Sequence, residues 1–149
     1  MYEIIDGQQR IVSAVMLLKT ILLKLEQQDE LKEMIKREKE RYLKFEDIYK
    51  LRLLGGDERF FREHIIDGKV YPHEVLTPPQ KRLKNAMRFF QQKVEQVKDI
   101  EVLKQMKLKI DNMEILVFLV SEESEASCIF TVVNDRGKLL TNLEKIKSF

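Results

Sequence analysis

The sequence predicts a mainly helical α+β protein, with a small strand-turn-helix core and a helical bundle. Two long segments, 8–28 and 80–97, repeat apolar residues at helical spacing. Two short apolar runs, 2–5 and 113–120, have the length of strands. With 149 residues, of which 44% are hydrophobic, the chain is long enough to bury a core, and we expect a single domain over 1–149.

The first half of the chain is expected to hold two helical segments and a short sheet. The helix over 8–28 has an apolar face made of Ile11, Val12, Val15, Leu18, Leu22 and Leu25. Its charged continuation over 29–42 has a narrow apolar stripe of Leu31, Met34 and Ile35, so it should run along the surface. Alternating apolar residues over 43–54 predict one or two short strands, ended by two glycines.

The middle of the chain predicts two more helices. Asp57 is expected to cap a helix that runs to about 66 and stops at Asp67-Gly68. Thr77 followed by two prolines is a typical helix entry. The helix over 80–97 presents one apolar seam of Leu83, Met87, Phe90, Val94 and Val97. Its basic residues lie mostly off that seam, which fits either a nucleic-acid backbone or an ordinary solvated face.

The last third predicts a helix over 101–110 and then, over 113–120, the best-buried strand. A helix over 121–134 with an acidic start should end at Arg136-Gly137. Thr141 and Glu144 form a capping box for a final helix.

Composition excludes several classes of protein. The net charge of +2 gives no global field for nucleic acid. The single cysteine, Cys128, is expected to be a small core residue, and His64 and His73 are not at metal-ligand spacing. With no apolar stretch of membrane length and no secretory signal, we expect a cytoplasmic protein.

The most informative segment is Asp6-Gly7-Gln8-Gln9-Arg10, which joins a short apolar strand to the first helix. A helix start offers unpaired N–H groups and a partial positive charge to a phosphate. Arg10 would hold the phosphate with its forked guanidinium, and Gly7 would let the backbone approach it. The same spacing also occurs in proteins that bind nothing, where Asp6 and Gln9 simply cap the helix.

The roles of the polar residues in this turn stay open. Asp6 would repel a phosphate unless it caps the helix or holds Mg²⁺. Gln8 or Gln9 would orient an attacking water. Near the other end, Asn134 and Arg136 would bring a polar contact and a second positive charge to the same cleft; the alternative for Arg136 is a salt bridge or a helix cap.

The two segments together resemble the GmrSD-type family, the N-terminal domains of modification-dependent restriction endonucleases and related phage-defence proteins. The resemblance is carried by Asp6 to Arg10 and by Asn134-Asp135-Arg136-Gly137-Lys138 with Leu140 and Ile146-Lys147. It implies a fold similar to the ParB and sulfiredoxin group, and the binding and hydrolysis of a nucleoside triphosphate with Mg²⁺. It also implies coupling to DNA recognition or cleavage.

Carried over residue by residue, the resemblance gives residues 6–10 as the nucleotide motif and Asn134, Arg136 and Gly137 as the second motif. From the chemistry of their side chains we expect Asp6, Gln8 and Gln9 to act in catalysis, with Asp6 also the candidate metal ligand. Nucleotide binding falls to Gly7, Arg10, Asn134, Arg136 and Gly137. The chain departs from the family after Arg10, where Ile11-Val12-Ser13-Ala14 stands in place of the usual Leu-Thr-Thr-Leu.

The chain is also shorter than usual family members. It lacks their upstream strands and downstream nuclease domain, so we expect a truncated piece of a longer architecture. The strand over 2–5 would then leave an edge that favours a homodimer. The sequence predicts a possible NTPase domain of a DNA restriction or phage-defence system; the alternative is a non-catalytic helical module that binds protein or DNA.

Overall fold

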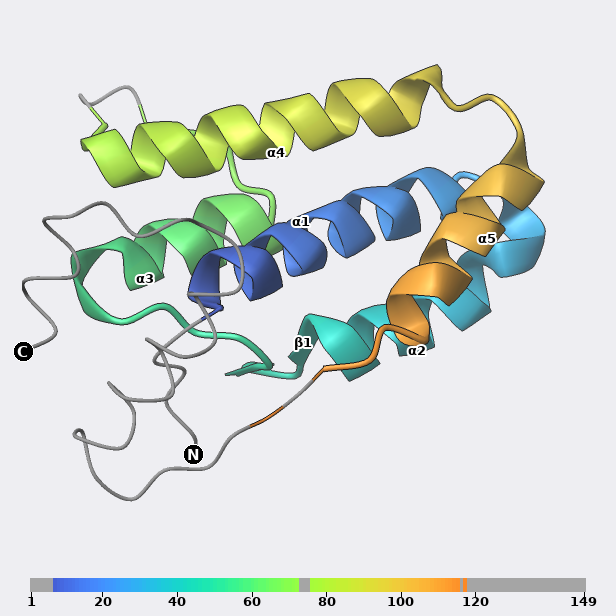
Figure 1. Ribbon diagram of the computed structural model, residues 1–149, viewed down its shortest axis with the longest axis horizontal. Coiled ribbons are helices and arrows are strands. Elements are labelled where there is room, and N and C mark those ends of the chain that lie inside the picture. Colours follow the sequence, from blue (N-terminus) through green and yellow to red (C-terminus); the bar gives the residue numbers. More distant parts are fainter. Residues whose placement is uncertain (1–6, 73–75, 116, 118–149) are drawn as a thin grey trace, which may run out of the picture. The chain divides into compact units, whose positions relative to one another are not determined.

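The computed structural model describes residues 7–72, 76–115 and 117. Its contacts divide the chain into two compact units, residues 9–113 and residues 1–8 together with 114–149. Apart from the first residue of α1, every described helix and strand belongs to residues 9–113 (Figure 1). The predictions for 2–5, 121–134 and the final helix lie outside the described residues.

The described elements are mostly helices. In chain order they are α1 (Gln8–Leu25), the 3₁₀ turn η1 (Asp29–Leu31), α2 (Lys32–Tyr42), β1 (Lys44–Phe45), β2 (Ile48–Tyr49), the 3₁₀ turn η2 (Gly55–Asp57), α3 (Glu58–Phe60), the π-helix η3 (Phe61–Ile66), α4 (Pro78–Gln96) and α5 (Ile100–Asp111). Among the described residues the only sheet is the antiparallel pair β1-β2. The mainly helical α+β class predicted from the sequence is confirmed.

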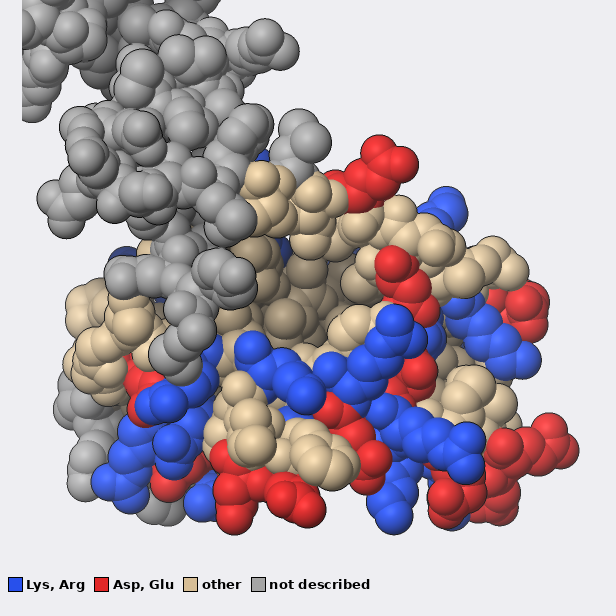
Figure 2. Space-filling model, turned by 90° about the horizontal axis from the view of Figure 1, so that it is seen from below, with Lys and Arg blue, Asp and Glu red and all other residues tan. Residues whose placement is uncertain are grey.

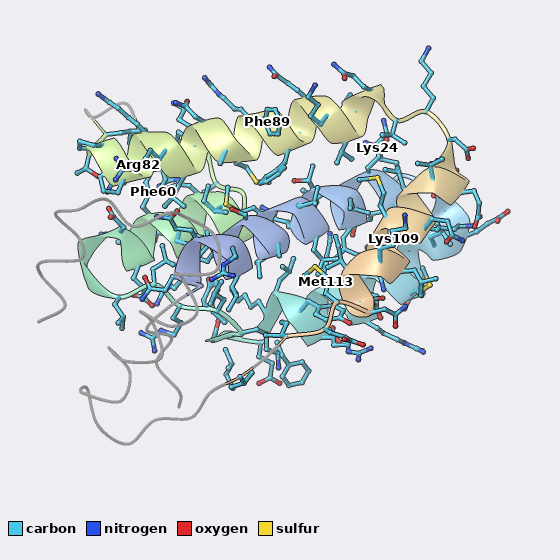
Figure 3. All side chains as sticks on the ribbon, in the orientation of Figure 1. Lys24, Phe60, Arg82, Phe89, Lys109 and Met113 are labelled. Atoms are coloured by element: carbon cyan, nitrogen blue, oxygen red, sulfur yellow. The ribbon has the colours of Figure 1, made fainter. Side chains whose placement is uncertain are left out.

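Helix α1 supplies the centre of the core. Most of its residues from Met16 onward are buried, namely Met16, Leu18, Lys19, Thr20, Ile21, Leu22 and Leu25. Thr20 Oγ1 contacts Met87 Sδ of α4 at 3.9 Å, and Lys24 Nζ pairs with Glu95 Oε1 of α4 at 2.7 Å (Figure 3). The predicted helix is confirmed, although it ends at Leu25 and not at 28.

The segment after α1 is not its continuation, which corrects the sequence prediction. The backbone turns at 26–28, and Gln28 has extended dihedral angles before η1 and α2 begin. This turn lets α2 fold back so that Ile35 is fully buried, whereas Met34 is 43% exposed. The charged face of α2 is therefore on the surface, as predicted, but Met34 does not belong to its buried stripe.

The predicted strands after α2 form a small hairpin. Lys44 pairs with Tyr49 and Phe45 with Ile48, around a two-residue loop in which Glu46 has a φ of 52°. The two strands cover fewer residues than the alternating pattern over 43–54 predicts. In the described part of the chain no third strand pairs with the hairpin, and a two-stranded sheet alone is only marginally stable.

The third helical segment runs to Ile66 as predicted, but Asp57 does not cap it. Asp57 already has helical dihedral angles in η2 and makes no capping hydrogen bond, whereas a capping side chain needs extended backbone. Its carboxylate accepts instead from Thr77 Oγ1 at 3.4 Å. The segment widens into the π-helix η3 and ends, as predicted, at Gly68, whose φ of 75° suits glycine.

Helices α4 and α5 confirm the sequence prediction most closely. Thr77 has the extended backbone of a cap, and it forms a capping box with Gln80. Met87 and Val94 of the predicted seam are 2% exposed. Residues Leu83, Phe90 and Val97 are partly buried against the core. The predicted helix over 101–110 is α5.

The predicted strand over 113–120 is wrong for its described residues. Residues 113–115 and 117 form no strand, and Met113, Ile115 and Val117 are 50%, 63% and 72% exposed. An apolar run becomes a buried strand only when a neighbouring strand pairs with it, and within the described residues β1 and β2 pair only with each other. Residues 116 and 118–120 lie outside the described part of the chain.

Candidate functional site

The motif residues that the structure describes lie at the start of α1. Gly7 directly precedes the helix with a φ of 80°. Residues Gln8, Gln9 and Arg10 occupy the first helical turn, and all three are exposed. The predicted position of Arg10 in that turn is confirmed, and so is a backbone at Gly7 that suits glycine.

This turn is an exposed helix start with a local excess of positive charge. The first N–H groups of an 18-residue helix have no partner within the helix, and the helix dipole gives that end a partial positive charge. The first turn of α1 contains no acidic residue, so Arg10 adds to this positive charge. Ser13, one turn further on, is exposed as well.

The remaining predicted site residues lie outside the described residues. These are Asp6, Asn134, Arg136 and Gly137, together with Cys128 and His73. The expected Asp6 cap, the metal role of Asp6 and the meeting of the two motifs therefore stay predictions.

The sequence reasoning missed a second basic residue of α1, Lys19. Its side chain is only 5% exposed, and Nζ donates a hydrogen bond to the backbone oxygen of Ile65 in η3. A carbonyl near the end of a helical segment lacks a partner within the helix, and a cation there interacts favourably with the helix dipole. Lys19 thus caps the C-terminal end of η3 by a hydrogen bond from within the core.

Burial is the main influence on the Lys19 ammonium. Burial first, and then the nearby charge of Lys39, lower the pKa of Lys19 to about 8, although Asp67 acts in the opposite direction. A signal for this residue was present in the sequence. Lys19 lies four residues after Val15 and three before Leu22, so it interrupts the apolar face of α1.

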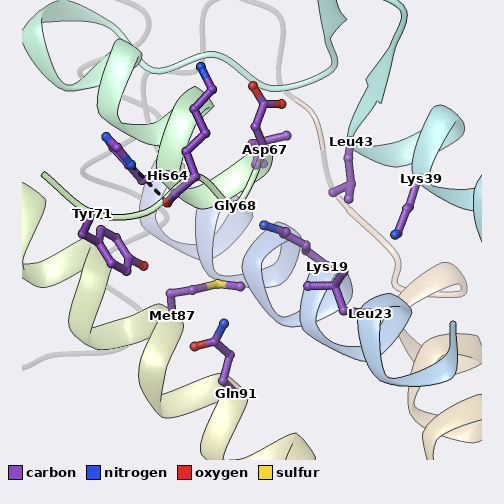
Figure 4. A pocket seen from close by; sticks show the side chains of 12 residues that line it. Lys19, Leu23, Lys39, Leu43, His64, Asp67, Gly68, Tyr71, Met87 and Gln91 are labelled. Atoms are coloured by element: carbon purple, nitrogen blue, oxygen red, sulfur yellow. Dashed lines mark hydrogen bonds between the residues drawn. The ribbon is translucent and has the colours of Figure 1, made fainter. Parts of the chain in front are cut away.

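A cavity of about 390 Å³ adjoins Lys19, and all its lining residues belong to residues 9–113 (Figure 4). Its charged lining residues are Lys19 of α1, Lys39 of α2, and Asp67 and Lys69 in the turn after η3. Helix α4 contributes Met87 and Gln91.

His64 and Tyr71 form an aromatic wall of this cavity. Their rings stack with centroids 5.7 Å apart and an interplanar angle of 29°. His64 Nδ1 lies 3.2 Å from the backbone oxygen of Lys69, and burial raises the pKa of the Tyr71 phenol. Packing against Tyr71 and one backbone contact account for the position of the His64 ring.

The described part of the chain has neither a metal-ligand cluster nor a membrane-spanning helix. No group of three or more His, Cys, Asp or Glu side chains there is arranged to hold a metal ion. None of its helices is both long and apolar enough to cross a membrane.

Comparisons with known proteins identify a family. No curated protein and no solved structure matches the chain. The family model described as "GmrSD restriction endonuclease, N-terminal domain" matches residues 1–149, which is the whole chain. This match confirms the resemblance carried by the two sequence motifs, and the chain belongs to the GmrSD restriction endonuclease N-terminal domain family.

Proposed function

We propose that this domain binds a nucleoside triphosphate at the turn formed by residues 6–10 and hydrolyses it with Mg²⁺, as part of a DNA restriction or phage-defence system. Family membership supports the setting, because the family is named for a restriction endonuclease. The observation that carries the site is the exposed first turn of α1. There Gly7 has a φ of 80°, and Arg10 lies in the first turn of the helix, the end that carries the partial positive charge of the helix dipole.

Each residue of the turn has a distinct part in phosphate binding. Gly7 lets the backbone come close to phosphate oxygens, and the N–H groups of the first turn donate to them. The guanidinium of Arg10 donates two parallel hydrogen bonds to a phosphate, which a lysine cannot do. Asn134, Arg136 and Gly137 complete the proposed binding site by family resemblance.

Hydrolysis needs a positioned water and neutralised phosphate charge. Gln8 and Gln9 are both exposed in the first turn, and the amide of one of them is proposed to orient the water. Mg²⁺ would neutralise charge on the phosphates when bound, and Asp6 is its proposed ligand. A small ParB- and sulfiredoxin-like core, a homodimer and a cytoplasmic location complete the proposal.

Calorimetric titration with ATP, GTP, CTP and UTP in Mg²⁺ tests the binding site. We expect at least one nucleotide to bind the wild-type chain, Arg10→Ala to abolish that binding, and Arg10→Lys to weaken it by about tenfold, because one parallel hydrogen bond is lost. Lys24→Met is the matched control, since Lys24 is a basic residue of the same helix that pairs with Glu95 at the opposite end.

The result also separates the two candidate functions. Arg10 is exposed, so Arg10→Ala should remain folded by circular dichroism. Absence of binding by all four nucleotides in the wild-type chain would leave a non-catalytic interaction module as the function.

A DNA contact is proposed along α4, since that helix carries an excess of positive charge. Its five basic residues, Lys81, Arg82, Lys84, Arg88 and Lys93, are opposed by one acidic residue, Glu95. Figure 3 labels Arg82 near the start of α4 and Phe89 near its middle. The face seen in Figure 2, in contrast, interleaves Lys and Arg side chains with Asp and Glu.

Salt-dependent binding to duplex DNA tests this surface. Replacing both Arg82 and Arg88 by alanine should reduce the slope of log K against log salt by about 2, because two phosphate contacts are lost. Lys109→Ala, an exposed lysine on α5, is the control. An unchanged slope in the double variant would remove α4 from the proposal.

A further inference from the structure

The hydrogen-bonding capacity of the Lys19 ammonium is only partly satisfied within the described residues. An ammonium has three N–H donors, and within the described residues Lys19 Nζ donates to one acceptor, the backbone oxygen of Ile65. Since the side chain is 5% exposed, bulk water does not readily replace the missing acceptors. Two donors of a buried cation therefore remain to be satisfied beside the cavity.

The charged side chains that line the cavity favour an anionic ligand. Among the described residues, three lysines line it, and Asp67 is the only acidic lining residue. The Asp67 carboxylate is already occupied, because it accepts from Tyr49 Oη at 2.7 Å and pairs with Lys44 Nζ at 3.5 Å.

The carboxylates that pair with the other two lysines do not line the cavity. Lys39 pairs with Glu26 at 2.5 Å and Lys69 with Glu63 at 3.5 Å. A ligand in the cavity would thus meet ammonium groups without a competing free carboxylate on the lining.

The turn after η3 leaves room beside Lys19. A Cβ atom built on Gly68 would lie 3.5 Å from Lys19 Nζ, so any larger side chain would crowd the ammonium. Figure 4 shows the Lys19 ammonium extended from α1 toward Asp67 and Gly68, with Lys39 reaching in from α2.

The remaining lining residues suit the flat or apolar part of a small ligand. Leu23, Leu43 and Met87 are apolar, and the stacked rings of His64 and Tyr71 form one wall. A volume of about 390 Å³ lies within the range of small-molecule sites.

We propose that this cavity is a second ligand site, which binds a small organic anion whose phosphate or carboxylate group pairs with Lys19 and whose ring packs on Tyr71 and His64. The site is separate from the turn at Arg10. Nine residues separate Arg10 from Lys19, which is two and a half helical turns and about 14 Å along α1, so their side chains lie on opposite sides of the helix.

Calorimetric titration of the whole chain with phenyl phosphate, benzoate and phenol tests the site. We expect phenyl phosphate or benzoate to bind with 1:1 stoichiometry, and the tighter of the two identifies the anionic group. Phenol should bind at least about tenfold more weakly, because it lacks the charge that pairs with the ammonium. Equal binding of phenol would overturn the proposal, as would the absence of saturable binding by both anions.

Variants locate the binding. Lys19→Met should weaken anion binding by about tenfold or more, and Lys39→Met should weaken it several-fold. Gly68→Ala should also weaken it. Gly55→Ala is the matched control, since Gly55 has a similar φ of 80° but nothing within 4 Å of the added Cβ.

Two further variants separate this site from the proposed nucleotide site. Lys24→Met should bind the anion as the wild type does, and Arg10→Ala should keep the part of the anion binding that Lys19→Met loses. Binding that is lost in Arg10→Ala but kept in Lys19→Met would place the anion at the motif and overturn the proposal. If Lys19→Met fails to fold, Lys39→Met and the two glycine variants still decide, because unchanged affinity in Lys39→Met and Gly68→Ala would overturn it.

Discussion

The first turn and the middle of α1 carry basic side chains in opposite surroundings. Arg10 is exposed in a turn that a sequence motif marks, whereas Lys19 is 5% exposed in the core and no motif marks it. Both are basic residues of one helix, and burial lowers the pKa of Lys19 to about 8. The difference teaches that a sequence motif identifies an exposed basic residue, whereas a buried basic residue is identified only by the packing of the fold.

The largest expected effect tests the contrast in burial. Leu22 is fully buried in the middle of α1, so Leu22→Ala should lower the free energy of unfolding by about 2 to 5 kcal/mol. Gln9→Ala, in the exposed first turn, should change it by about 0.5 kcal/mol or less. Urea denaturation followed by circular dichroism measures both, and equal losses would show that the two ends of α1 do not differ in this way.

The second prediction concerns the pH dependence of stability. Because the pKa of Lys19 is lowered to about 8 in the folded chain, the unfolded chain binds more protons between pH 8 and pH 10.5, and the free energy of unfolding should rise with pH there. Relative to Lys19→Met, the wild type should gain about 2 to 3 kcal/mol across this window.

Parallel urea titrations of the two proteins from pH 7.5 to pH 10.5 measure this gain, and the subtraction cancels the titration of the other lysines and tyrosines. Groups near Lys19, chiefly Lys39 and Asp67, are present in both proteins. Parallel curves would show that Lys19 keeps its ordinary pKa.

The third prediction separates backbone strain from contact with Lys19. Gly68→Ala and Gly55→Ala should each cost about 1 to 2 kcal/mol, because both glycines have a positive φ. Only Gly68→Ala places a methyl group 3.5 Å from Lys19 Nζ, so only this variant should alter the pH dependence. The same urea titrations test both variants, and identical pH profiles would argue against a close approach of Gly68 to Lys19.

The smallest effect belongs to the third basic residue of α1. Lys24 is 18% exposed and pairs with Glu95, which is 69% exposed, so Lys24→Met should cost about 0.2 to 1 kcal/mol. The loss should shrink further at 1 M salt, where exposed ion pairs are screened. A larger loss that does not depend on salt would mean that Lys24, like Lys19, is held by the core.

Local signals were reliable where one segment decides its own structure. Thr77 with two prolines and Gln80 predicted the start of α4, and the apolar spacing of α1 and α4 predicted their buried faces. Asp57 and the run after Met113 misled, because a capping side chain needs extended backbone and an apolar strand needs a partner. Both requirements depend on neighbours that the spacing of one segment does not reveal.

For this protein the sequence by itself determined the mainly helical class, the family, and the position of Arg10 in the first turn of α1. These follow from periodicity and from short motifs, which act within a few residues along the chain. The tertiary structure decided the turn between α1 and α2, the π-helix η3, and the cavity beside Lys19. These features depend on which distant residues pack together. Lys19, for example, is a buried cation only because the end of η3, 46 residues further along the chain, packs against it and accepts its hydrogen bond.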